Sequence, residues 1–189
     1  VAHNIEIHYN TNGTIYPNEA ENIWYHFKHV EIAFSIDATK ERFEYQRTEA
    51  KWSEVEANIA KFKTLREQFT NISLQVCSTI NIFNVMYLDE VAEWIDKQGF
   101  DFVYWNMLHD APVHSIISLP KEAKKIVYNK LVNSNSNHVE EFKRTAEFMM
   151  QREGVSQYDL LLDIKKLDQR RGHSLSDNHN ELAKAIEYK

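Results

Sequence analysis

The chain has 189 residues, a net charge of −6, 43% hydrophobic residues and 26% charged residues. This length supports one domain with a sizeable core, and the composition is ordinary for a soluble globular protein. The negative balance disfavours a nucleic-acid partner, because phosphate neutralisation needs a basic face. No apolar run approaches the roughly 18 residues that span a bilayer, so no membrane partner is expected. The single cysteine, Cys77, indicates a reducing, cytoplasmic setting.

The chain opens with a pattern typical of a strand. Residues 3–9 alternate apolar and polar side chains and stop at the turn-forming residues 10–13. Apolar residues then recur at helical spacing after a proline, which predicts a helix over 17–28. A β-rich run over 30–36 predicts the second strand.

A second helix and a third strand follow. Residues 52–67 carry apolar side chains at helical spacing, and Ser53 is the expected N-cap of that helix. Residues 72–80 alternate again and predict a strand.

The next unit repeats this order. Residues 85–98 predict a helix that ends at Gly99, and residues 102–108 predict a fourth strand. Alternating strands and helices at this spacing predict parallel strands with right-handed crossovers. A complete barrel, a doubly wound sheet and a partial barrel all satisfy that order.

The chain becomes helical after residue 120. Residues 120–132, 137–152 and 156–170 have helical spacing, and a shorter helical pattern covers 181–186. Four strands make half of a (β/α)₈ cylinder. The fold class predicted is therefore α/β: a partial TIM-type barrel of about four parallel strands at 1–132, followed by a helical extension at 133–189.

Functional groups of such folds gather after the strands. Thr11 and Asn12 follow the first strand, where a tight turn is the simplest interpretation. Ser35 and Asp37 follow the second strand, and Arg47 comes shortly after. An arginine grips a carboxylate bidentately, and a serine hydroxyl can donate to the same group. Asp37 has two interpretations, a ligand for a ribose hydroxyl or a cap of the next segment.

The fourth loop contains Trp105, Asn106, His109, Asp110 and His114. Short His/Asp spacings of this kind are common by chance, and no third firm ligand follows, so no metal site is predicted. Cys77 is interpreted as a small buried hydrophobe, because the sequence places no cation beside it. The remaining histidines are expected at the surface or at helix ends.

Several of these pieces occur in an order that resembles a known family. The pieces are Tyr9–Thr14, Phe34–Asp37, Tyr45–Arg47, Asn81–Asn84 and the tail segment Leu167–Leu175. Their order and spacing are similar to those of radical S-adenosylmethionine (SAM) enzymes of the SPASM/twitch-type branch. The resemblance implies that residues 3–9 correspond to barrel strand three and residues 102–108 to strand six.

The resemblance also implies a chemistry. In the family, a [4Fe-4S] cluster cleaves SAM to a 5′-deoxyadenosyl radical that abstracts a hydrogen atom from the substrate. The site residues carried over by position are Ser35 and Arg47 for the methionine carboxylate, Asp37 beside them, Thr11 and Asn12 at the floor, the backbone of Trp105 and Asn106 near the adenine, and His109, Asp110 and His114 for substrate.

The sequence departs from the family in two respects. Ala38 occupies a position where glycine is common, and the C-x₃-C-x₂-C triad that holds the cluster is absent. Cys77 cannot replace three thiolates. The expectation is therefore a fragment whose cluster segment lies upstream of Val1. Such a fragment is inactive alone and binds neither SAM nor the cluster alone, while the parent enzyme acts on a small molecule, a peptide or a protein.

Two alternatives remain open. One is a non-catalytic module that binds a nucleotide-like ligand or a partner, and the other is an unrelated doubly wound α/β protein. The latter is disfavoured by the absence of a G-x-G-x-x-G or G-x₄-G-K-[ST] run in a chain with four glycines. A first strand without an upstream neighbour also predicts a homo-oligomer formed through the exposed sheet edge.

Overall fold

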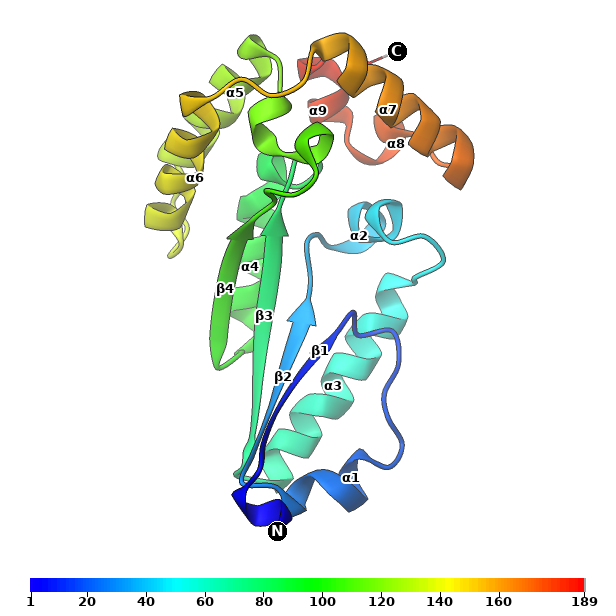
Figure 1. Cartoon of the computed structure of the whole chain (residues 1–189), viewed down its shortest axis with the longest axis vertical. Helices are drawn as coiled ribbons and strands as arrows, with labels where there is room; N and C mark the ends of the chain where they lie inside the picture. Colours follow the sequence, from blue (N-terminus) through cyan, green and yellow to red (C-terminus); the bar gives the residue numbers. More distant parts are fainter. Residues whose placement is uncertain (189) are drawn as a thin grey trace.

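The computed structural model describes residues 1–188 and has an α/β fold built on one parallel sheet. Its strands lie side by side in chain order (Figure 1). They are β1 (Glu6–Thr11), β2 (His29–Ser35), β3 (Ile72–Ile80) and β4 (Phe102–Met107). Each neighbouring pair is parallel. The prediction of four parallel strands is confirmed.

Nine α-helices accompany the sheet in the described residues. They are α1 (Ala20–Ile23), α2 (Lys40–Gln46), α3 (Trp52–Gln68), α4 (Leu88–Gln98), α5 (Lys121–Val132), α6 (Val139–Gln151), α7 (Gln157–Arg171), α8 (Leu175–Asn178) and α9 (Asn180–Ala185). Short 3₁₀ turns cover Ala2–Asn4, Trp24–His26, Val85–Tyr87, Pro112–His114 and Ile116–Ser118. No helix described here has the length and apolar character needed to cross a membrane.

Two local predictions were wrong. The helix expected over 17–28 is only α1 followed by one 3₁₀ turn. Ser53 does not cap α3, because that helix begins one residue earlier, at Trp52. The Trp52 N–H instead donates to Glu44 Oε1 at 2.9 Å, so a carboxylate from α2 satisfies it. Gly99 ends α4 in the left-handed conformation, with φ +66°, as the sequence predicted.

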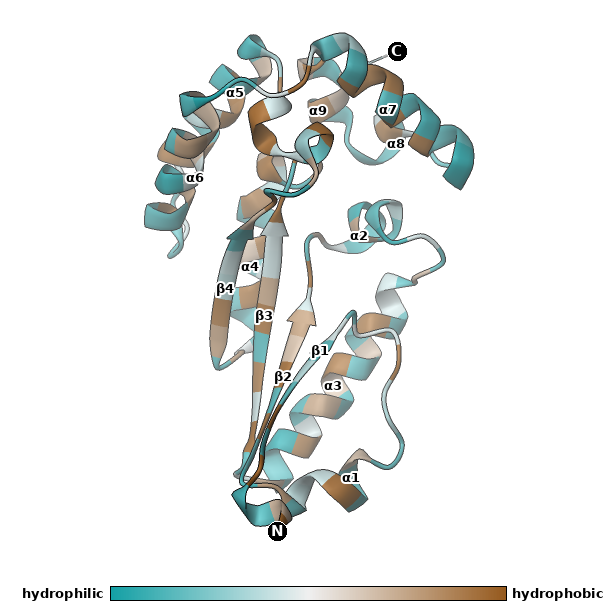
Figure 2. Cartoon of the chain, in the orientation of Figure 1, coloured by the Kyte–Doolittle hydropathy of each residue, from teal (hydrophilic) through white to brown (hydrophobic). Residues whose placement is uncertain are grey.

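One face of the sheet carries the apolar core. Alternate residues of β2 and β3 point toward α3 and α4, and Ile32, Phe34, Leu74 and Val76 are fully buried there. Figure 2 shows brown segments on the strands and on both helices. A second apolar cluster joins residues 80–88 to helices α5–α9, so the tail packs on the segment that follows β3.

The opposite face of the sheet is polar and largely open (Figure 1). His8 pairs with Glu31, and Gln75 Nε2 donates to the same carboxylate at 2.9 Å. Phe102 and Tyr104 of β4 are 64% and 60% exposed on this side. The tail helices lie beyond the carboxyl ends of the strands, where they leave most of this face uncovered.

Candidate functional site

A cavity of about 230 Å³ lies at the carboxyl ends of the strands, and we call it the strand-end cavity. Its walls come from the segments after β2, β3 and β4 and from α7. The lining residues are Asp37, Gln46, Arg47, Asn81, Phe83, Leu108, His114, Leu167 and Arg171. Parallel strands bring these loops together, because their carboxyl ends share one edge of the sheet.

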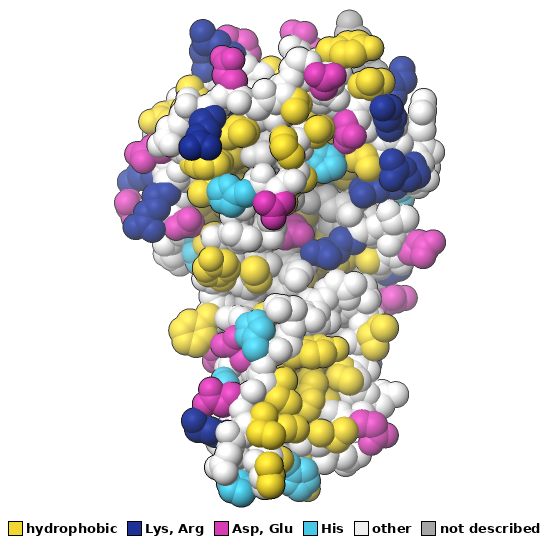
Figure 3. Space-filling view, viewed as in Figure 1, with side chains coloured by type: hydrophobic (Ala, Val, Ile, Leu, Met, Phe, Trp, Pro, Cys, Tyr) yellow, Lys and Arg dark blue, Asp and Glu magenta, His cyan; other side chains and the backbone are white. Residues whose placement is uncertain are grey.

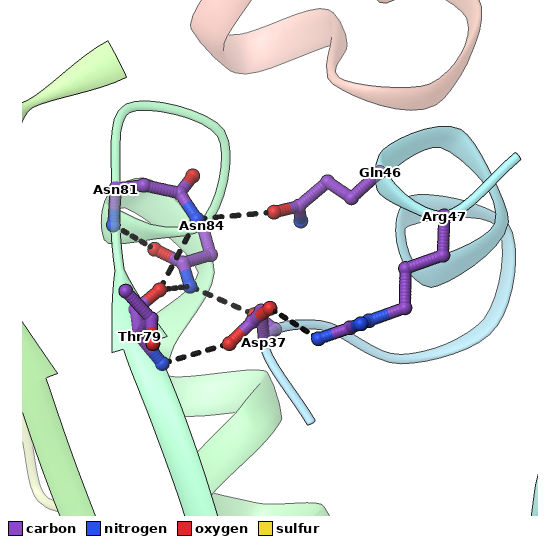
Figure 4. A network of polar contacts seen from close by, with 6 residues as sticks. All are labelled: Asp37, Gln46, Arg47, Thr79, Asn81 and Asn84. Atoms are coloured by element: carbon purple, nitrogen blue, oxygen red, sulfur yellow. Dashed lines mark hydrogen bonds and ion pairs between the residues drawn. The ribbon is translucent and has the colours of Figure 1, made fainter. Parts of the chain in front are cut away.

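Asp37 connects two walls of the strand-end cavity (Figure 4). Its Oδ1 accepts a hydrogen bond from the Thr79 N–H at 2.7 Å, and its Oδ2 accepts one from Arg47 Nη2 at 2.7 Å. Burial raises the pKa of the Asp37 carboxyl above its ordinary value, while the Arg47 charge and the Thr79 N–H oppose that shift. Both carboxylate oxygens are thus engaged, and Asp37 orients the guanidinium of Arg47.

The loop after β3 is held by two amides (Figure 4). The fully buried Asn84 donates through Nδ2 to the carbonyls of Asp37 and Thr79, each at 2.9 Å. Its Oδ1 accepts from the Asn81 N–H at 2.8 Å. Asn81 Nδ2 in turn donates to Gln46 Oε1 at 3.2 Å. These bonds tie the segments after β2 and β3 into one rigid wall.

Two buried donors of this wall have no hydrogen-bond partner among the described residues. They are Nε of Arg47 and Nε2 of Gln46. An unpaired buried donor costs about 1–3 kcal/mol, so buried polar groups are normally satisfied. Both residues line the strand-end cavity. Both atoms are covered in this structure, so an acceptor of a ligand reaches them only if these side chains move.

Helix α7 closes the other side of the strand-end cavity. Arg171, its last residue, donates through Nη1 to the Tyr45 carbonyl at 2.9 Å. His114 Nε2 lies 2.8 Å from Asp163 Oδ2 on the same helix. The cavity is therefore lined by two guanidinium groups and one carboxylate, and that carboxylate is already paired. This balance favours an anion with acceptor oxygens.

The structure brings three of the sequence-predicted site residues to this cavity: Asp37, Arg47 and His114. Thr11 is the last residue of β1 and Asn12 follows it, and both side chains instead stabilise the turn after this strand. Thr11 Oγ1 accepts from the Gly13 N–H at 3.0 Å, and Asn12 Oδ1 accepts from the Thr14 N–H at 3.1 Å. Both lie at the same edge of the sheet as the cavity without lining it.

The remaining predicted residues also lie near the strand ends without lining the strand-end cavity. Ser35 is the last residue of β2 and is half-buried beside Cys77. The Trp105 side chain turns toward α6, where Nε1 donates to His138 Nδ1 at 3.1 Å. Asn106, next along β4, is exposed.

His109 and Asp110 are exposed beyond β4, outside the cavity lining. The His109 ring meets Phe148 of α6 edge-on, with 5.5 Å between the ring centroids.

Sequence reasoning did not assign Gln46 or Arg171 to a site. Gln46 directly precedes Arg47, so its position in the chain could have indicated it. Arg171 had no comparable signal, because α7 reaches the cavity only through tertiary packing.

The fit of an iron–sulfur cluster can be judged from the thiols and the metal-ligating side chains. The described residues contain no group of three or more His, Cys, Asp or Glu side chains placed to hold a metal ion. Cys77 is a lone thiol whose pKa is raised by burial and by the Asp37 charge, which opposes thiolate formation. These residues do not fit a [4Fe-4S] cluster.

No family model matches this chain, and no curated protein matches it either.

Proposed function

We propose that this chain supplies half of a TIM-type barrel, with the helical tail, to a radical SAM enzyme of the SPASM/twitch-type branch. The ordered pieces at Tyr9–Thr14, Phe34–Asp37 and Tyr45–Arg47 support the assignment. The single observation that carries the proposal is Arg47 at a strand-end cavity, where Asp37 holds its partly exposed guanidinium. That guanidinium is suited to the carboxylate of the methionine moiety of SAM.

The chain's own contribution is to bind and orient this ligand. Arg47 holds the carboxylate, Asp37 fixes the Arg47 side chain, and Ser35 lies at the same sheet edge as a further donor. Thr11, Asn12, Trp105 and Asn106 lie near neighbouring strand ends, outside the lining of the strand-end cavity. His109, Asp110 and His114 remain the residues proposed for substrate contact. In the parent enzyme a [4Fe-4S] cluster would supply the electrons for radical generation, and the described residues of this chain contain no ligand set for it.

The two outer strands of the sheet leave edges through which two copies of the chain could associate. Within residues 1–188, β1 and β4 each pair on one side only. Hydrophobic side chains gather over the region of β1 and α1 in Figure 3, and Ile5, Tyr9, Ile15 and Ile23 are among the exposed apolar residues there. An unpaired parallel edge beside apolar surface favours pairing with another chain. We therefore propose a cytoplasmic homo-oligomer that buries this edge, which light scattering at high concentration tests; a monomer would contradict it.

Binding of S-adenosylhomocysteine, which shares the amino-acid and adenosyl groups of SAM, tests the ligand assignment. The sequence led us to expect no SAM binding by the isolated chain, but the strand-end cavity lies within this chain, so we now propose that it retains binding of S-adenosylhomocysteine. Titration followed by NMR should show this binding, and Arg47→Gln should weaken it at least about tenfold, since a charge-assisted hydrogen bond is lost. Arg144→Gln is the matched control, because that side chain is 75% exposed on α6. Equal weakening by both substitutions, or no binding to the unchanged chain, would contradict the proposal.

The missing cluster has its own test. Anaerobic reconstitution of the isolated chain with iron and sulfide should give no visible absorption, because Cys77 is its only thiol. Stoichiometric cluster incorporation would show that the ligands are present after all.

The alternative is a module that binds a nucleotide-like ligand and catalyses nothing. The observation that favours it is the same cavity together with the lone thiol. The coding sequence upstream of Val1 discriminates the two: a cysteine triad there supports the enzyme, and a start codon with nothing before it supports the module.

A further inference from the structure

Helix α7 places a second arginine at the strand-end cavity. Arg171 lines it together with Arg47 and lies half-buried at the helix C-terminus. Its Nη1 donates to the Tyr45 carbonyl at 2.9 Å, and no carboxylate of the described residues lies within ion-pair distance of it. Arg171 thus forms no ion pair with a described side chain.

Tyr45 forms hydrogen bonds with the tail through both its hydroxyl and its backbone carbonyl. Its hydroxyl donates to Asp168 Oδ1 at 2.9 Å, while its carbonyl accepts from Arg171. Asp168 Oδ2 accepts from the Tyr188 hydroxyl at 2.8 Å and from the Leu175 N–H at 2.9 Å, which fixes the carboxylate within the tail. Gln46 and Arg47 follow Tyr45 directly, so α7 sets the position of the residues that carry the unpaired donors.

This wall contains hydrogen-bond donors that have no acceptor in the described part of the chain. Arg47 Nη2 is occupied by Asp37, but Arg47 Nε and Gln46 Nε2 are buried without partners. Asp37 accepts one hydrogen bond on each oxygen, from Arg47 Nη2 and from the Thr79 N–H, and forms none with Arg47 Nε or Gln46 Nε2. Arg47 and Arg171 both line the strand-end cavity, and a ligand with two adjacent acceptor oxygens and a negative charge suits a pair of guanidinium groups; a carboxylate has that chemistry.

We propose that Arg171 and Arg47 bind one carboxylate group between them, so that the tail supplies half of the anion site. The inference rests on the proposed function in one respect, because the carboxylate of the amino-acid moiety of SAM is the intended ligand. It also predicts a ligand class by itself: a small amino-acid-like carboxylate. The tail is then a part of the binding site and not only a cover for the apolar residues after β3.

The test compares Arg171→Gln with Arg170→Gln, its exposed neighbour on α7. The ligands are L-methionine, methioninol, in which an alcohol replaces the carboxylate, and S-adenosylhomocysteine. Arg171→Gln should weaken binding of L-methionine and S-adenosylhomocysteine about ten- to a hundredfold, as expected for the loss of a charged hydrogen-bond partner. Arg170→Gln should leave both affinities unchanged, and methioninol should bind weakly to every variant.

A measurement on the unsubstituted chain keeps the test independent of folding. The Nε resonances of Arg47 and Arg171 should shift on titration with L-methionine, whereas that of Arg170 should not. Equal affinities of the Arg171→Gln and Arg170→Gln variants, or an unshifted Arg171 resonance, would overturn the shared site. If L-methionine binds through Arg171 and S-adenosylhomocysteine binds no better, the shared site stands and the radical SAM assignment fails. If Arg47→Gln weakens binding of S-adenosylhomocysteine and Arg171→Gln does not, the radical SAM assignment stands and the shared site fails.

Discussion

A buried histidine should make this protein sensitive to mild acid. His179 lies between α8 and α9 and is 0% exposed, and neither ring nitrogen has a hydrogen-bond partner among the described residues. Its ring packs against Tyr45 and Tyr87, at centroid distances of 4.8 and 5.5 Å. Burial, and next the Arg42 charge, lower the pKa of His179 to about 3.

The sign of the effect follows from where the proton binds. The folded state keeps His179 neutral down to a pH of about 3, whereas the unfolded chain takes up the proton near its ordinary pKa of about 6.5. Stability is therefore fully present above about pH 6.5 and is lost as the pH falls toward 3. The loss accumulates at about 1.4 kcal/mol per pH unit, which gives about 2 kcal/mol at about pH 5.

This contribution of His179 to stability can be measured by urea unfolding. The unchanged chain and His179→Leu are compared at several pH values between about 5 and 7.5. The leucine variant should lose less stability on acidification, and the difference between the two chains should change by about 2 kcal/mol over that range. Carboxylate protonation affects both chains and cancels in the difference. His173→Gln, at an exposed position of the tail, should follow the unchanged chain. Parallel pH curves for the unchanged chain and His179→Leu would refute the reasoning.

Two further substitutions test the packing that positions the candidate site. Gly154→Ala would place a Cβ 2.1 Å from Ser118 Oγ and should destabilise the fold by about 2 kcal/mol or more in thermal or urea unfolding. Gly99→Ala is the comparison, because its new Cβ meets nothing within 4 Å and only the positive φ is strained, which should cost about 1 kcal/mol. Equal losses of stability in the two variants would contradict the close approach of Gly154 to Ser118. Asn84→Ala removes three hydrogen bonds of a buried side chain and should cost about 2–4 kcal/mol. The exposed Asn135→Ala should cost little, and urea unfolding measures both.

Local sequence patterns predicted much of the fold. The third strand was predicted with its observed bounds, Ile72–Ile80, because its alternation has the two-residue period of a strand. The end of α4 at Gly99 followed from a residue that readily adopts a positive φ. The short α1 was overestimated, because apolar residues at helical spacing also occur where a chain packs in a 3₁₀ turn.

The candidate site was only partly accessible to the same reasoning. Asp37, Arg47 and His114 were singled out because polar residues that follow parallel strands meet at one sheet edge. Trp105 differs, since an alternating strand does not reveal which partner its side chain will meet, and here that partner is His138. His179 was expected at the surface or at a helix end; it does lie at a helix end, and burial there is what makes it acid-sensitive.

The sequence by itself determined the order of strands and helices and the polar character of the strand ends, because both are written in the spacing of neighbouring residues. Only the tertiary structure decided that Arg171, 126 positions from Tyr45, shares a cavity with Arg47. The same holds for the burial of His179 among aromatic rings. These contacts depend on where the tail helices pack against the strand ends. That position is fixed by apolar faces that lie far apart in the sequence, and the spacing of neighbouring residues does not encode it.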